Sequence, residues 1–279
     1  GPRLEAALKA IPSISITTDM ANLLDPVSGI YNNGYQSGRE WERPGSVELI
    51  NPDGTPGFQI GAGLRIRGSA SGTGANPKHS FRLFFRSEYG ASSLDYPLFG
   101  SEGVDSFEKL DLRTAQNYSW SMDGDPNNNF IAEVFSRDTM RDLGQPYTRS
   151  RFYHLYINGQ YWGLFQSEER PDADFAASYF GGDADDYDVI KTESGSYNIE
   201  ATDGDLGAWT RLWDAVAGPN KLDLANDAAY FGLQGLYPDG SPNPGAEALV
   251  DVDNLIDYML VILYGGNLDA PISNFLLNA

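Results

Sequence analysis

The chain has 279 residues, of which 41% are hydrophobic and 13% aromatic, and these values are typical of a folded globular protein rather than a disordered one. Lys and Arg number 19 against 39 Asp and Glu, so the formal net charge is −20, which repels nucleic acids and anionic membrane surfaces. Because the chain has no Cys and only two His, disulfides and thiolate metal sites are excluded, and a multi-histidine metal site or a Ser-His-Asp triad is disfavoured.

We expect one domain, because single hydrophobic cores stop growing at roughly 250–300 residues. Residues 1–15 lack the basic flank and apolar run of a signal peptide, and no stretch approaches the roughly 20 apolar residues of a membrane span. The predicted fold class is α+β, with an antiparallel β-rich part over about residues 1–125 and a more helical, mixed part over about residues 126–279.

Alternating apolar residues predict strands in the first part of the chain. In GLRIRG, Leu64 and Ile66 share one face, whereas Arg65 and Arg67 share the other. A loop of small residues, SASGTGANP, follows, and Lys78 stands at the start of the next predicted strand, KHSFRLFF. Two further strands are predicted over residues 13–18 and 46–50.

The apolar period then changes to that of a helix over residues 129–143, which Gly144 terminates. Asn158-Gly159 separates two alternating aromatic segments and predicts a β-hairpin with a type I′ turn. Further along, residues 208–218 and 251–266 predict helices, and the second of these is apolar enough to predict a buried helix.

Three segments together carry a family pattern. They read PKHSFRLFFRSEYG over residues 77–90, YINGQYWGLFQSEERPD over residues 156–172 and NLDAPISNF over residues 267–275. With these segments the chain resembles the CotH kinase family, named for spore coat protein H, an atypical protein-kinase-like group. The resemblance implies a kinase-like fold, ATP and Mg²⁺ or another divalent cation as cofactors, and phosphotransfer to protein hydroxyl groups. It also implies export to the cell surface or extracellular space, as in coat proteins.

The loop of small residues is a candidate nucleotide contact. Gly68, Gly72 and Gly74 would let the backbone approach phosphates closely, although the spacing differs from G-x-G-x-x-G, and a plain hairpin connection is the alternative. Lys78 would contact the phosphates, as the β3 lysine does in protein kinases, or would be a solvated edge-strand residue. 

Three other charged residues are assigned around this loop. Arg65 and Arg67 would either add positive charge to the nucleotide site or form salt bridges. Glu133, on the predicted helix, is in a position to pair with Lys78.

Asp269 and Asn274 have the spacing of the protein-kinase catalytic loop, in which the Asp accepts the proton of the substrate hydroxyl and the Asn binds Mg²⁺. We therefore assign Asp269 as the catalytic base, and both Asp269 and Asn274 as metal ligands. The kinase His-Arg before the Asp is replaced by Asn267-Leu268. In kinases a further acidic metal ligand follows downstream of this loop, whereas the sequence ends at Ala279 before such a residue. We therefore expect this chain to be a fragment that binds Mg²⁺-ATP weakly or not at all, because one carboxylate ligand is missing.

Glu168 and Glu169 lie next to each other at the end of a predicted strand, so their side chains point to opposite faces. The resemblance indicates Glu169 as the residue facing the nucleotide. Adjacent residues on opposite faces do not suit the paired carboxylates of glycoside hydrolases. Asp188 and Lys191 also recur in the resemblance, and structural ion pairs explain them best.

A different class of function remains open. The chain would then be a catalytically silent coat or surface module that binds a protein or polysaccharide through exposed aromatic residues such as Tyr161 and Trp162. A kinase requires that Lys78 and Asp269 face one cleft, whereas a binding module does not.

Overall fold

The computed structural model describes residues 1–68, 76–115, 130–192, 198–267 and 276–278. The chain forms two compact units, one of Gly1–Val134 with Thr148–Arg170, and one of Phe135–Tyr147 with Pro171–Ala279. The hairpin after residue 147 therefore belongs with the first unit, because its strands complete a barrel there. The mixture of helices and strands confirms the predicted α+β class.

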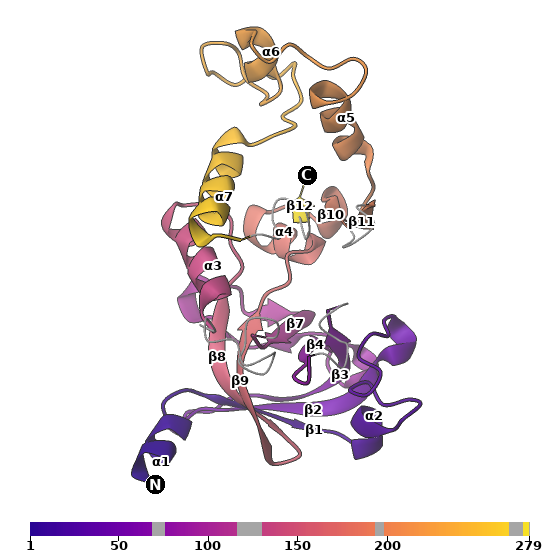
Figure 1. Ribbon diagram of the computed structural model, residues 1–279, viewed down its shortest axis with the longest axis vertical. Coiled ribbons are helices and arrows are strands. Elements are labelled where there is room, and N and C mark those ends of the chain that lie inside the picture. Colours follow the sequence, from indigo (N-terminus) through magenta and orange to yellow (C-terminus); the bar gives the residue numbers. More distant parts are fainter. Residues whose placement is uncertain (69–75, 116–129, 193–197, 268–275, 279) are drawn as a thin grey trace. The chain divides into compact units, whose positions relative to one another are not determined.

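Seven strands close into the barrel of the first unit, in the spatial order β1-β2-β3-β4-β7-β9-β8 (Figure 1). β1 and β8 pair in parallel, and the other neighbours pair antiparallel. The strands are β1 (Ser13–Thr17), β2 (Arg43–Ile50), β3 (Gln59–Arg67), β4 (Ser80–Phe84), β7 (Lys109–Arg113), β8 (Ser150–Ile157) and β9 (Gln160–Glu168).

The core of the first unit lies where the alternating apolar residues of these strands meet. Leu64, Phe81 and Leu112 are fully buried and come from three adjacent strands, with Phe81 paired directly with Leu112. The opposite face of the same strands carries Arg65, Arg82 and Asp111, as the period of two requires. The face of β3, β4 and β7 opposite the core therefore carries charged side chains, and Asp111 among them is buried.

Smaller elements accompany the barrel. They are α1 (Pro2–Leu8), α2 (Met20–Leu24), the short 3-10 helices η1 (Arg39–Trp41), η3 (Ser87–Tyr89) and η4 (Gly100–Glu102), and a two-stranded sheet of β5 (Leu94–Asp95) and β6 (Ser106–Phe107). Helix α3 (Ala132–Asp142) confirms the helix predicted over residues 129–143 and begins in the first unit.

The predicted hairpin joins β8 to β9 and is confirmed. Asn158 has φ 49° and Gly159 has φ 79°, the positive values that a type I′ turn needs. The Asn158 side chain also accepts a hydrogen bond from the Thr18 backbone N–H at 3.0 Å and donates one to the Thr18 carbonyl at 2.9 Å. These bonds attach the turn to the end of β1.

Replacing Gly159 by Ala is expected to destabilise the protein by about 1 kcal/mol, because a Cβ is strained at positive φ. A Cβ at this position would meet no atom within 4 Å, so the cost comes from the backbone alone. Urea denaturation measures it. Gly232→Ala, also in open space but without a positive φ, is the control and should change the midpoint little. Equal midpoints for both variants would contradict this account of the turn.

The second unit contains a three-stranded sheet of order β11-β10-β12, the greater part of α3 and, among its described residues, four further α-helices. The elements are α4 (Ala173–Phe180), η5 (Ala184–Asp186), β10 (Val189–Thr192), β11 (Ile199–Asp203), α5 (Gly207–Val216), α6 (Asp227–Gly232), α7 (Val252–Gly265) and β12 (Leu276–Asn278). Helices α5 and α7 confirm the two helices predicted in this part.

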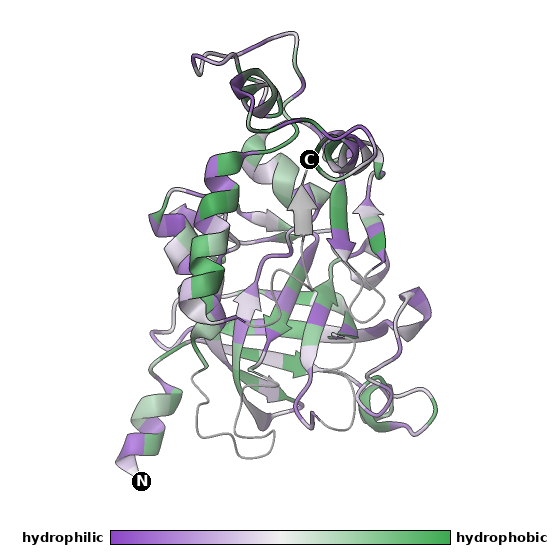
Figure 2. Cartoon of the chain, turned by 45° about the horizontal axis from the view of Figure 1, so that its top comes forward, coloured by the Kyte–Doolittle hydropathy of each residue, from purple (hydrophilic) through white to green (hydrophobic). Residues whose placement is uncertain are grey.

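The prediction that α7 is a buried helix is wrong. Of its residues only Val261 and Ile262 are buried, whereas Leu263 and Tyr264 are 70% and 84% exposed. Figure 2 shows hydrophobic residues along much of this helix. An apolar sequence predicts burial only where neighbouring elements cover every side of a helix. Among the described helices of the chain, none is long and apolar enough to cross a membrane.

Candidate functional site

The Lys78 side chain crosses from the start of β4 to β9. Its ammonium donates a hydrogen bond to the Leu164 carbonyl oxygen at 3.2 Å and lies 4.8 Å from the centre of the Phe165 ring. Within the described residues, no carboxylate pairs with it. Burial lowers the pKa of Lys78 to about 8. Lys78 is thus a half-buried cation whose charge is not balanced by a neighbouring acid in the described part of the chain.

Gly163 on β9 makes room for this ammonium. Its φ is 126°, and a Cβ built there would lie 2.5 Å from the Lys78 Nζ. Both the backbone conformation and the close approach require Gly. The family segment around YWGLFQ therefore shapes β9 to receive the side chain of Lys78.

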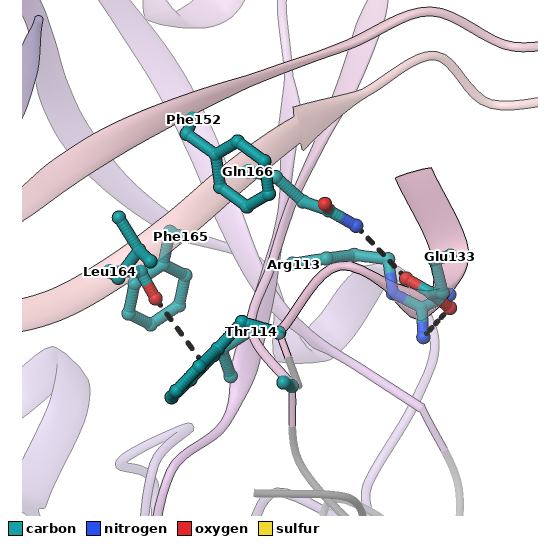
Figure 3. Close-up of a pocket in the computed structure, with 9 residues that line it drawn as sticks. Arg113, Thr114, Glu133, Phe152, Leu164, Phe165 and Gln166 are labelled. Carbon is teal, nitrogen blue, oxygen red and sulfur yellow. Dashed lines mark hydrogen bonds and ion pairs between the residues drawn. The ribbon is translucent and has the colours of Figure 1, made fainter. Parts of the chain in front are cut away.

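The first unit contains a hollow beside β7 and β9 (Figure 3). Leu164 and Phe165, which contact Lys78, also line this hollow. The lining residues are Arg113, Thr114, Ala115, Phe130, Glu133, Phe152, Leu164, Phe165 and Gln166. The hollow is apolar on the side of β8 and β9 and charged on the side of β7 and α3.

An ion pair between Arg113 on β7 and Glu133 on α3 forms the charged side of the hollow (Figure 3). Gln166 donates a hydrogen bond to the Glu133 carboxylate at 2.9 Å, and Glu168 lies 3.5 Å from the Arg113 guanidinium. The predicted pairing of Glu133 with Lys78 is therefore corrected: the carboxylate pairs with Arg113. The reason is that β7 lies between β4 and β9 and carries Arg113 toward α3.

Arg67 is held at a buried carboxylate on the same barrel face. It pairs with Asp111, whose side chain is 1% exposed, and Arg82 binds the two oxygens of that carboxylate at 2.6 and 2.8 Å. Burial raises the pKa of Asp111, but the charges of Arg67 and Arg82 outweigh burial and lower this pKa to about 2. Asp111 is therefore an ionised structural anchor.

Arg65 is held in the same way by Glu42, at distances of 3.0 Å from its Nε and 2.6 Å from its Nη2. Arg86 also binds Glu42, at 3.1 Å. Of the two roles considered for Arg65 and Arg67, salt bridges are the one the structure shows. Their charges are balanced by buried acids.

The side chains of Glu168 and Glu169 point in different directions, as neighbours on a strand do. Glu169 accepts a hydrogen bond from the Arg149 backbone N–H at 2.7 Å and lies 3.3 Å from the Arg149 guanidinium. Glu168 instead faces Arg113, which lines the hollow. The structure therefore places Glu168, rather than Glu169, beside the hollow.

Several predicted site residues lie outside the described residues: Gly72, Gly74, Asp269 and Asn274. Gly68 is described, directly after β3, with φ 101°. Whether Lys78 and Asp269 face one cleft stays a prediction. No cluster of three or more His, Asp or Glu side chains suited to a metal occurs within the described ranges.

Asp188 and Lys191, of the second unit, have structural partners. Asp188 accepts a hydrogen bond from the Asp205 backbone N–H at 2.7 Å, and Lys191 lies 2.5 Å from Glu200 on the neighbouring strand. The turn contact and the ion pair account for both residues without a catalytic role.

The aromatic residues of the alternative binding module do not share one surface. Tyr161 is 51% exposed and packs on Tyr156, whereas Trp162 packs against the core and meets Tyr31 edge-on at 5.5 Å. Adjacent strand residues point to opposite faces, so the two rings cannot stack on one ligand.

Arg113 and Gln166 were not predicted as site residues. The segment KLDLR has the alternation of a strand, with Leu110 and Leu112 on one face and Asp111 and Arg113 on the other. This alternation alone would have placed Arg113 on the polar face of a predicted strand. Its pairing with Glu133 depends on the barrel, which joins residues distant in sequence.

A family model described as CotH kinase protein matches residues 64–278, which is more than half of the chain. The matched region includes the second half of β3, all of β4, and Lys78, Arg113 and Glu133. A search of curated proteins finds no match. The chain belongs to the CotH kinase family.

Proposed function

We propose that this protein transfers a phosphoryl group from ATP, with Mg²⁺ or another divalent cation, to hydroxyl groups of a protein. Membership of the CotH kinase family supports a kinase-like activity. The arrangement of β3, β4, β7 and α3, with its cationic side chains, supports the nucleotide as the donor.

The observation that carries the proposal is the order of elements around the Arg113–Glu133 ion pair. A hairpin of β3 and β4 with a loop of small residues precedes β7, and α3 follows β7. In protein kinases a glycine-rich hairpin loop, a strand with a cationic residue and a helix with its Glu partner follow one another in the same order. In this proposal the Arg113–Glu133 ion pair would correspond to that kinase pair.

Lys78 would then supply the cation that contacts the phosphates. Arg113 is paired with Glu133, and Arg65 and Arg67 are paired with buried acids, whereas Lys78 has no acidic partner among the described residues. A cation without a nearby acid attracts phosphate most strongly, because no carboxylate competes for it. Lys78 is therefore the predicted phosphate contact.

The remaining residues have proposed supporting roles. Gly68, with Gly72 and Gly74 of the loop, would bring backbone N–H groups to the phosphates. Asp269 would accept the proton of the acceptor hydroxyl, and Asn274 would be a metal ligand. The divalent cation, when bound, neutralises charge on the phosphates. Arg65, Arg67 and Glu169, all held in salt bridges, would position the strands that bear the site.

The proposed acceptor is a protein, and export to the cell surface or a coat is proposed from the family alone. A nucleic-acid partner is not proposed, because the chain has a formal charge of −20. 

Replacing Lys78 by Met in the full-length native protein is expected to weaken its nucleotide binding at least about tenfold, since one charge-assisted phosphate contact contributes about 1.5–3 kcal/mol. Isothermal titration with Mg²⁺ and a non-hydrolysable ATP analogue measures it. Lys221→Met, at an exposed lysine, is the matched control and should leave the affinity unchanged. Unchanged affinity in the Lys78 variant would remove this residue from the nucleotide site.

The same affinity should depend on pH. Phosphate is attracted by the ammonium form, and the pKa of Lys78 is about 8, so affinity should be fully present at neutral pH and fall as the pH rises through 8. Lys78→Arg keeps its charge at all these pH values and should give a nearly constant affinity. Titrations at several pH values between roughly 7 and 9.5 compare the two proteins. Parallel profiles would show that another group controls binding.

A further inference from the structure

The hydroxyl group of Tyr31 binds the main chain on both sides of Lys78. It donates a hydrogen bond to the Pro77 carbonyl oxygen at 3.0 Å and accepts one from the His79 backbone N–H at 3.2 Å. Residues 77–79 lie just before β4, outside the strand ladders of the barrel. One side chain, 46 positions away from Pro77 in the sequence, therefore bridges the two peptide groups that flank the Cα of Lys78.

The Tyr31 ring also contacts the strand that receives the Lys78 side chain. It lies 4.4 Å from the His79 ring and meets the Trp162 ring edge-on at 5.5 Å, measured between ring centres. Trp162 precedes Gly163 on β9, and the Lys78 ammonium lies against that glycine. Tyr31 thus joins the segment that carries Lys78 to the part of β9 beside which its ammonium lies.

A second hollow lies beside the Tyr31 ring. Its volume is about 40 Å³, and it is lined by Tyr31 and Trp162 together with residues of α2 and of the β8–β9 hairpin. A single water needs roughly 10–15 Å³ of such space, so the ring has room to move on this side. Packing alone therefore does not fix the ring, and the hydrogen bonds of its hydroxyl contribute to its position.

The Tyr31 hydroxyl keeps its proton at neutral pH. Burial raises the pKa of Tyr31 above its ordinary value of 10, because the ionised form is poorly solvated there. The proton is the one donated to the Pro77 carbonyl. The main chain of Tyr31 is held as well, since its N–H donates a hydrogen bond to the Leu23 carbonyl of α2 at 2.9 Å.

We infer that Tyr31 is a positioning residue, whose hydroxyl holds residues 77–79 in the place from which the Lys78 ammonium reaches β9. The hydrogen bond from Lys78 to Leu164 is 3.2 Å long, at the upper end of the N–H···O range, so a main-chain shift of about 1 Å breaks it. The consequence for nucleotide binding rests on the proposed function. A phosphate would then have to order an ammonium that is no longer held, which weakens binding.

The first measurement concerns Lys78 itself and requires no nucleotide. In the native protein with isotope-labelled lysine, the Phe165 ring, 4.8 Å from the ammonium, should shift the NMR signals of the Lys78 side chain away from those of the exposed Lys221. The Lys78 signals are assigned by their absence from the Lys78→Met variant. Tyr31→Phe should move them toward the values of Lys221, because the ammonium leaves the aromatic ring.

Tyr96→Phe is the matched control in the same unit. The Tyr96 hydroxyl also makes two contacts, donating to the Pro56 carbonyl at 3.4 Å and accepting from the Asn51 amide at 3.5 Å. This variant should leave the Lys78 signals unchanged, and urea midpoints establish that each variant is folded under the conditions used. Identical Lys78 signals in the native and Tyr31→Phe proteins would overturn the inference.

The second measurement is isothermal titration with Mg²⁺ and a non-hydrolysable ATP analogue. Tyr31→Phe in the full-length native protein should weaken binding about fivefold, the factor that one typical hydrogen bond contributes. In the Lys78→Met background the same change should have no further effect, because Tyr31 acts through Lys78. A loss that persists undiminished in that background would reveal a general structural effect and would overturn the positioning role.

The two measurements separate this inference from the proposed function. If the native protein does not bind the analogue, the proposed function is wrong, and the NMR comparison still decides whether Tyr31 positions Lys78. If Lys78→Met weakens binding but Tyr31→Phe does not, the positioning role alone is wrong.

Discussion

Replacing Asp269 by Asn is expected to lower the rate of phosphotransfer by roughly 10²–10⁴-fold, the range that general-base catalysis contributes in enzymes. An amide cannot accept the proton of the attacking hydroxyl, yet it is nearly isosteric with the carboxylate. Nucleotide affinity should therefore fall much less than the rate. The assignment rests on the spacing from Asp269 to Asn274 and on family membership, because both residues lie outside the described part of the structure.

The measurement is the transfer of labelled phosphate from ATP to a protein acceptor by the native protein and by the variant. Asp253→Asn, at an exposed position in the first turn of α7, is a matched control with the same chemical change. It should retain the native rate. Equal incorporation of label by the native protein and the Asp269 variant would exclude Asp269 as the base.

Replacing Asp111 by Ala is expected to destabilise the protein by about 3–5 kcal/mol, because it leaves buried cations without their counter-charge. Arg67 and Arg82 both bind this carboxylate, and their side chains are only 25% and 22% exposed. The loss of free energy should appear in the urea midpoint.

Asp142→Ala is the control for this variant. Asp142 also pairs with an arginine, Arg141, at 2.9 Å, but its side chain is 69% exposed. An exposed ion pair contributes at most about 1 kcal/mol, so the control should unfold near the native midpoint. If the two variants lose similar stability, the Asp111 network is not the anchor that its burial indicates.

Acid unfolding tests the same network. The pKa of Asp111 is about 2 in the folded protein, below its ordinary value of 3.8. A depressed pKa contributes stability above the unfolded value, and that contribution is lost as the pH falls from about 4 through 2. The Asp111 variant should therefore lose less of its stability over this acid range than the native protein does.

The local features of the fold were predictable because neighbouring residues determine them. Asn158 and Gly159 specify the hairpin turn through positive φ values alone, and the alternation of Leu64 with Arg65 identifies the faces of β3. Helix α3 ends at Asp142, two residues before Gly144, whose φ is 81°. Each of these conclusions requires only a few adjacent residues.

The partners in the candidate site were not predictable in this way. Glu133 pairs with Arg113 rather than Lys78 because the barrel places β7 between β4 and β9, and that order is a property of the whole sheet. The exposure of α7 likewise depends on which elements pack around it, not on its own apolar sequence. The contact between Lys78 and Leu164 joins residues 86 positions apart.

The central claim is that Lys78 and Asp269 face one nucleotide. A crystal structure of the native protein with Mg²⁺ and a non-hydrolysable ATP analogue tests it most directly. We expect the Lys78 ammonium within hydrogen-bonding distance of a phosphate oxygen and the Asp269 carboxylate beside the terminal phosphate. An analogue bound away from Lys78, or Lys78 and Asp269 on opposite sides of the molecule, would contradict the account.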